Sequence, residues 1–237
     1  MESTKQRARF AGFLYLLLAV IAPIGIVYVP GQLFVRGDAA ETGRRILASE
    51  PLFRLGIASG LISPIVSLFV VLALYRVFED VNPRQARLMV ILGALVPTPI
   101  SLLNILNSLA ALTFFGGVGQ LSVFARAQLD ALGMTFLRLH SEGITVASIF
   151  WGLWLFPFGT LVVRSRFIPR LFGYLLFVAG VGYLVSAFTS LILPRYAGAV
   201  GSGSMILEMC ELPIILWLVI WGARPRADSG GLTSRGV

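Results

Sequence analysis

Apolar residues fill most of the chain in long runs, each about as long as a helix that crosses a bilayer core of ~30 Å. The six runs are 10–29, 55–75, 88–115, 144–163, 171–193 and 205–221. Pro23 predicts a kink in the first run, and the sequence VPTP predicts a kink or tilt in the third, which is longer than the others. The pattern therefore predicts an all-α membrane protein, a polytopic bundle of six transmembrane helices.

Two connecting segments carry apolar residues at helical spacing and are predicted to form short amphipathic helices on the extracytoplasmic face. The first, DAAETGRRILASEPLFRLG, opens with Asp38 as a candidate N-cap. The second, LSVFARAQLDALGMTFLRLH, spans 121–140 and places its apolar side chains near one side. Either segment is explained as a packed connector or as an element that binds a partner.

Basic residues predict the orientation of the helices. With the N-terminus in the cytoplasm, 12 of the 19 Lys and Arg residues fall on the cytoplasmic side and seven on the other, where the loops are longer. We therefore expect both termini to be cytoplasmic and the protein to be a multi-pass protein of the bacterial inner membrane. Residues 1–222 are predicted to form one transmembrane domain, and 223–237, rich in Gly, Ser and Arg, a disordered cytoplasmic tail.

Composition agrees with this class and narrows the partners. Of the 237 residues 57% are hydrophobic and only 13% are charged, and the mean hydropathy is +0.88. The net charge of +8 is explained by basic residues at helix ends that meet anionic lipid headgroups, and no basic face with interleaved aromatic residues indicates nucleic acid. Membrane lipids are thus the expected partners. Cys210 is the one cysteine, which excludes an internal disulfide.

The last run, MILEMCELPIILWLVIWG, contains two acids three residues apart on one helix face, Glu208 and Glu211. At about 1.5 Å per residue, Glu208 lies roughly 6 Å below the outer boundary and Glu211 roughly 10 Å. An ionised carboxylate in a membrane costs several kcal/mol unless it is paired or solvated. Glu208 can be explained by a side chain that reaches the outer interface, whereas Glu211 needs a partner inside the bundle.

Other polar residues fall in the same outer half of the predicted bundle, and they define a candidate ligand-binding pocket that opens to the extracytoplasmic side. The candidate residues are His140, Glu211, Asn107, Asn104, Glu208 and Arg54, with Arg138 at a matching depth. We expect Glu211 to face Asn107 or His140. The alternative is structural: a helix–helix hydrogen bond or salt bridge for Glu211 and an interfacial, hydrogen-bonded role for His140.

No sequence pattern identifies a cofactor or a specific reaction. H-E-x-x-H, G-x-S-x-G, the P-loop and the dinucleotide glycine pattern are all missing from the sequence. A single histidine excludes a bis-histidine haem and a His-rich zinc site. One His and two Glu could hold a divalent ion, but no spacing is specific for such a site.

Several segments together resemble a known family. RARFAGFLYLLLAVIAPIG, FLRLHSEG, RSRFIPRLFGYLL and CELPIILWLVIWG are similar to the bacterial membrane family catalogued as domain of unknown function 4386, over about residues 7–222. The resemblance implies a six-span inner-membrane architecture, with His140 and Glu211 at recurrent motif positions, and it implies no established activity or ligand. Where many members have a small residue before the motif glutamate, this chain has Cys210.

Three functions are consistent with the sequence. The first is a membrane protein that binds or moves a small molecule, a lipid or a proton through the outward-facing polar pocket. The second is an intramembrane hydrolase that uses His140 and Glu211, with acid/base or metal assistance. The third is a structural or regulatory subunit without chemistry. The pattern favours the first, and it leaves enzymatic activity undecided.

Overall fold

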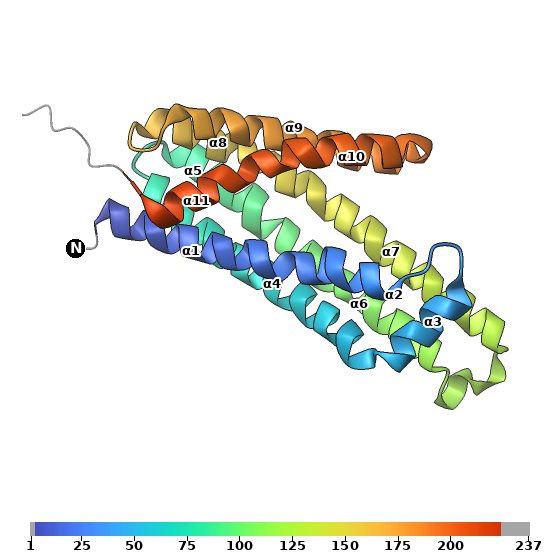
Figure 1. Cartoon of the computed structure of the whole chain (residues 1–237). Helices are drawn as coiled ribbons and strands as arrows, with labels where there is room; N and C mark the ends of the chain where they lie inside the picture. The colour runs from blue at the N-terminus through green and yellow to red at the C-terminus, as the bar shows by residue number, and fades with distance from the viewer. Residues whose placement is uncertain (1–2, 224–237) are drawn as a thin grey trace, which may run out of the picture.

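The computed structural model describes residues 3–223, which form helices and short connections with no strand. Six helical segments are long and apolar enough to cross a membrane, which confirms the predicted six-span bundle: Thr4–Leu33, Glu50–Phe78, Pro83–Gly116, Arg126–Ser165, Arg170–Ile192 and Pro194–Ile220. Figure 1 shows them as one elongated bundle. The predicted disordered tail falls outside the described residues, apart from Ala223.

Four of the six spans consist of more than one helical element. The first is α1 (Thr4–Pro23), the π-helix η1 (Ile24–Tyr28) and α2 (Val29–Leu33); the second is α4 (Glu50–Phe78); the third is α5 (Pro83–Val90), the π-helix η2 (Ile91–Leu95) and α6 (Pro97–Gly116); the fourth is α7 (Arg126–Leu153) and α8 (Leu155–Ser165); the fifth is α9 (Arg170–Ile192); the sixth is η4 (Pro194–Tyr196), α10 (Ala197–Glu208), the 3-10 turn η5 (Met209–Glu211) and α11 (Leu212–Ile220).

The beginning of α1 and the end of α11 lie at the same end of the bundle (Figure 1). There the Arg9 guanidinium donates a 2.6 Å hydrogen bond to the Ile220 carbonyl, one of the carbonyls that a helix end leaves without an intrahelical partner. We call this the terminal end. The opposite end carries α3 (Ala39–Ala48) and η3 (Gly119–Val123) and is called the α3 end.

Only one of the two connecting segments forms a separate helix. In α3, the Asp38 carboxylate accepts a hydrogen bond from the Glu41 amide, as predicted for an N-cap, and Ile46 on its apolar face is buried. The prediction of a second separate helix over 121–140 was wrong. From Arg126 onward that segment is the first part of α7 and continues directly into the fourth span, because no residue there breaks the backbone hydrogen bonding.

Two apolar clusters hold the bundle together, and the same four spans contribute to both. Near the terminal end, buried side chains such as Leu74 and Phe158 pack in one cluster. Near the α3 end, Phe115 packs in a second cluster, so close to Gly43 and Gly133 that a Cβ at either position would meet its ring. Along the spans, the segment between the clusters is rich in small residues. Small side chains leave space between helices, and this is where the structure contains a cavity.

Candidate functional site

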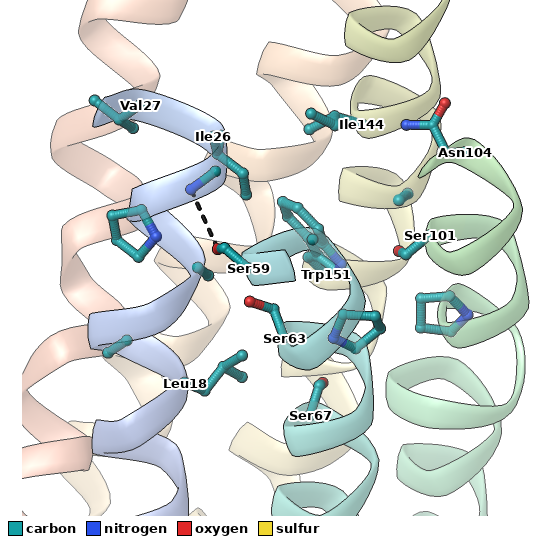
Figure 2. Close-up of a pocket in the computed structure, with 18 of the residues that line it drawn as sticks. Leu18, Ile26, Val27, Ser59, Ser63, Ser67, Ser101, Asn104, Ile144 and Trp151 are labelled. Atoms are coloured by element: carbon teal, nitrogen blue, oxygen red, sulfur yellow. Dashed lines mark hydrogen bonds between the residues drawn. The ribbon is translucent and has the colours of Figure 1, made fainter. Parts of the chain in front are cut away.

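A cavity of about 390 Å³ lies between the two apolar clusters, inside the membrane-spanning part of the bundle. All six spans contribute residues to its wall, and Figure 2 shows part of that wall. On α4 the lining runs from Gly56 to Ser67. At about 1.5 Å per residue, that stretch starts about 9 Å from the α3 end of α4 and stops about 17 Å from its terminal end. The cavity therefore lies nearer the α3 end, which the basic residues predict to be extracytoplasmic.

A serine hydroxyl interrupts the first span beside the cavity. Ser59 Oγ donates a 2.7 Å hydrogen bond to the Ile21 carbonyl and accepts a 3.2 Å hydrogen bond from the Gly25 amide. In a regular α-helix that amide would bond that carbonyl directly, so the hydroxyl from α4 is inserted into the helical ladder. This insertion, next to Pro23, is the physical cause of the π-helix η1, whose residues Ile26 and Val27 line the cavity.

Three further spans change helical geometry at or next to the cavity. The π-helix η2 ends just before Pro97 and Thr98, which line the cavity. The α7–α8 break falls at Trp154, and the 3-10 turn η5 contains Glu211; both residues also line the cavity. Irregular backbone at membrane depth is tolerated where it is buried in protein or faces a cavity, because lipid cannot bond the freed backbone groups. π-turns of this kind are frequent at functional sites.

Glu211 has its hydrogen-bond partner on the first span. The Tyr15 hydroxyl donates to Glu211 Oε1 from α1, across 196 residues of sequence. The Tyr15 ring is 3% exposed and lies 5.8 Å from the Trp154 ring, centroid to centroid, which fixes the direction of the hydroxyl. The bonded partner of Glu211 is therefore Tyr15 and neither of the two residues it was expected to face, Asn107 or His140, although His140 lines the same cavity.

Those two residues belong to a hydrogen-bonded clamp between α6 and α7. Asn104 Nδ2 donates to the His140 carbonyl at 2.8 Å, and Asn107 Nδ2 donates to Asn104 Oδ1 at 2.9 Å. His140 Nδ1 lies 3.2 Å from the Asn104 carbonyl oxygen. Since a carbonyl can only accept, Nδ1 carries the hydrogen of this bond, and Nε2 has no hydrogen-bond partner within residues 3–223. Gly143 makes the clamp possible, because any Cβ there would overlap the Asn104 amide.

The structure thus brings four of the six predicted site residues to one cavity. His140, Asn104, Glu208 and Glu211 line it, whereas Asn107 supports Asn104 from the side. Arg54 does not line this cavity. Its guanidinium pairs with Glu50 at 2.6 Å one turn away on α4, and its side chain is 60% exposed. Its position at a span entrance indicated the correct end of the helix but could not indicate the face.

Sequence reasoning missed most of the polar wall. Ser59, Ser63 and Ser67 line the cavity at intervals of four residues, and that spacing places them on one face of α4. The spacing was the signal that could have identified this wall. Figure 2 shows Ser63 and Ser67 on the same face of the α4 ribbon as Ser59. The hydroxyl of Ser63 is buried and has no hydrogen-bond partner within residues 3–223.

The acidic and basic side chains on the cavity wall are all of one kind, acidic. The lining contains two carboxylates, those of Glu208 and Glu211, and no Lys or Arg side chain. In the part of the chain that the structure describes, no three His, Cys, Asp or Glu side chains are grouped closely enough to hold a metal ion. The wall is otherwise apolar and aromatic, with hydroxyl and amide groups spaced along it. Such a wall can hold a small molecule by apolar contact and orient it by a few hydrogen bonds.

Fold and site together define an integral membrane protein: a six-span helical bundle with interrupted helices around an internal cavity. Comparison with known proteins then assigns the family. The chain belongs to the family described as Domain of unknown function (DUF4386), whose model matches residues 10–222. This confirms the resemblance noted in the sequence.

One similar curated protein is an uncharacterized protein of Archaeoglobus fulgidus, 34% identical over 76 residues. The match covers 32% of this chain and 44% of that protein, so it spans less than half of either. No solved structure matches the chain.

Proposed function

We propose that the protein binds a small amphipathic molecule inside the membrane, in the cavity between its two apolar clusters, and exchanges it with the outer half of the bilayer. The observation that carries the proposal is the coincidence of the cavity with interrupted helices in four of the six spans. Helix interruptions at membrane depth are typical of binding sites in transporters. A volume of about 390 Å³ is within the range of small-molecule sites.

The packing of the sixth span supports entry from the side. Near the cavity, α10 packs against α9, η4 and η5, while α1 packs against α11 nearer the terminal end. Figure 1 shows α10 and α2 diverging toward the α3 end. Val27 on η1 is 65% exposed and lines the cavity, and Glu208 on α10 also lines it. A ligand dissolved in the bilayer would enter between these two elements.

The contacts of His140 and Glu211 do not favour the hydrolase. An acid/base pair has to meet at a common substrate or water. Here the His140 Nδ1 and Glu211 Oε1 atoms are bound to the Asn104 carbonyl and the Tyr15 hydroxyl, and no hydrogen bond within residues 3–223 joins the two side chains.

Cysteine labelling tests whether the cavity admits a small molecule. In a Cys210→Ala background, Ser101→Cys places a thiol on the cavity wall, and Ser108→Cys places one on the same helix at a position 5% exposed and outside the cavity. N-ethylmaleimide, a small uncharged reagent, is added to protein in lipid nanodiscs. We expect Ser101→Cys to be labelled at least about tenfold faster than Ser108→Cys. Equal labelling rates would refute the binding function and favour a structural subunit.

A further inference from the structure

The sign of the charge on the cavity wall restricts the ligand. A ligand with a carboxylate or phosphate would find two carboxylates and no Lys or Arg side chain on the wall. The four Arg residues in ion pairs within residues 3–223 bond to acids of α3, α4 and α7 that do not line the cavity. Bringing an anion into this cavity would therefore leave its charge without a partner, which is strongly unfavourable away from water.

Glu208 is the group on this wall that needs a partner. Glu211 receives the Tyr15 hydroxyl, but Glu208 has neither a hydrogen bond nor an ion pair to any residue from 3 to 223. Its backbone is held in place by close packing of α10 on α9. A Cβ on Gly182 would lie 2.8 Å from Leu207 Cβ and 3.2 Å from the Glu208 nitrogen. The carboxylate is thus presented at the cavity by a rigid helix contact and is left for a ligand to bind.

Aromatic rings form part of the same cavity wall as this carboxylate. The Trp151 and Tyr183 rings lie edge to face with centroids 6.4 Å apart, and the Tyr15 and Trp154 rings lie 5.8 Å apart. All four residues line the cavity. Aromatic faces attract cations and also pack against the apolar body of a ligand. The unpartnered hydroxyl of Ser63 adds one hydrogen-bonding group on the α4 wall.

Size and chemistry argue against a metal ion as the ligand. A volume of about 390 Å³ is far larger than the site of a bound ion, and the wall offers two carboxylates from adjacent turns of one span without a third acidic, His or Cys ligand grouped with them. A cation with an apolar body uses both the charge and the space.

We infer that the ligand of this cavity is an amphipathic organic cation, a quaternary or protonated amine with an aromatic or alkyl body, whose charge pairs with Glu208 and whose body packs on Trp151 and Tyr183. The inference rests on the proposed function and specifies its ligand class. It requires no chemical step, only exchange of the cation between the bilayer and the cavity.

Binding of a charge-matched set of probes tests the ligand class. The probes are phenyltrimethylammonium, its uncharged isostere tert-butylbenzene, and benzenesulfonate as the anion. They are titrated into protein in nanodiscs of phosphatidylcholine, with intrinsic fluorescence as the readout, because two of the four tryptophans line the cavity. We expect saturable binding of the cation, at least tenfold tighter than of either other probe.

The variants place that binding at Glu208. Glu208→Gln should weaken the cation at least tenfold and leave tert-butylbenzene unchanged, and Glu208→Asp should retain the preference for the cation. Glu142→Gln, an exposed acid on α7 outside the cavity, should change nothing. Equal binding of cation and isostere, a preference for benzenesulfonate, or wild-type cation affinity in a folded Glu208→Gln protein would each overturn the inference. If Ser101→Cys is still labelled faster than Ser108→Cys in those cases, the proposed binding function stands and only the organic-cation ligand class fails. If that difference in labelling is also lost, the binding function and the ligand class both fail.

Discussion

Gly143→Ala should be among the most destabilising single-methyl additions in this protein, and its cost should depend on Asn104. A Cβ at position 143 would lie 2.7 Å from Asn104 Nδ2 and closer still to the rest of the amide. The amide would have to move, which breaks its 2.8 Å bond to the His140 carbonyl and its 2.9 Å bond from Asn107. The first bond joins α6 to α7 and the second lies within α6; at about 0.6 kcal/mol each, the value for a side-chain hydrogen bond in a membrane, they contribute about 1 kcal/mol. With ~1–3 kcal/mol for overpacking, the expected cost is about 2–4 kcal/mol.

The double-mutant cycle isolates the cause. In an Asn104→Ala background the methyl group has room, and Gly143→Ala should then be neutral or stabilise the helix by up to about 1 kcal/mol. The coupling free energy between the two substitutions should therefore be about 2–5 kcal/mol, far above the ~0.5 kcal/mol expected for independent sites.

The assay is the free energy of unfolding in mixed micelles, measured by titration with sodium dodecyl sulfate. Gly201→Ala in α10 is the matched control, since a Cβ there meets nothing within 4 Å and should change the stability by at most about 1 kcal/mol. If Gly143→Ala costs the same in the wild-type and Asn104→Ala backgrounds, the clamp between α6 and α7 does not exist as described.

Three further predictions use the same assay. Ser59→Ala should cost about 1–3 kcal/mol because it leaves the Gly25 amide and the Ile21 carbonyl unbonded, whereas Ser63→Ala, which removes an unpartnered hydroxyl, should cost nothing; equal effects would contradict the inserted-hydroxyl account. Tyr15→Phe should cost about 1–3 kcal/mol through the lost bond to Glu211, against no change for Tyr28→Phe, which is 55% exposed; a neutral Tyr15→Phe would contradict that bond. Arg44 and Arg45 lower the pKa of Glu41 from 4.5 to about 2, so its stabilising contribution should be complete above pH 4.5 and be lost as the pH falls toward 2. The stability difference between wild type and Glu41→Gln should shrink over that window, and a difference that grows on acidification would reverse the assigned sign.

The spans were predictable because each is an apolar run of bilayer length, and hydropathy records that property directly. Their internal geometry was less predictable. Pro23 indicated a disturbance in the first span, but the π-turn that follows depends on Ser59, a residue of another helix that local sequence cannot connect to it. The continuity of α7 into the fourth span was missed because its first half is amphipathic, as a separate surface helix would be.

The candidate site was predictable where burial of a polar group is costly. Charged and amide side chains at membrane depth are rare enough to be noticed, and His140, Asn104, Glu208 and Glu211 all line the cavity. Their partners could not be identified in that way. Tyr15 is an ordinary residue for a membrane helix, and its bond to Glu211 depends on how the first and sixth spans cross. Arg54 was assigned by depth alone, and its pairing within α4 shows that depth does not determine which face a side chain occupies.

Protection from labelling measures most directly whether the cavity binds an organic cation. The rate of N-ethylmaleimide labelling at Ser101→Cys, in the Cys210→Ala background, is followed as phenyltrimethylammonium is increased. We predict a saturable fall in the rate, with a midpoint equal to the dissociation constant from fluorescence, and at least a tenfold higher midpoint in Glu208→Gln. A labelling rate that stays constant while the fluorescence titration saturates would place the cation outside the cavity and contradict the account.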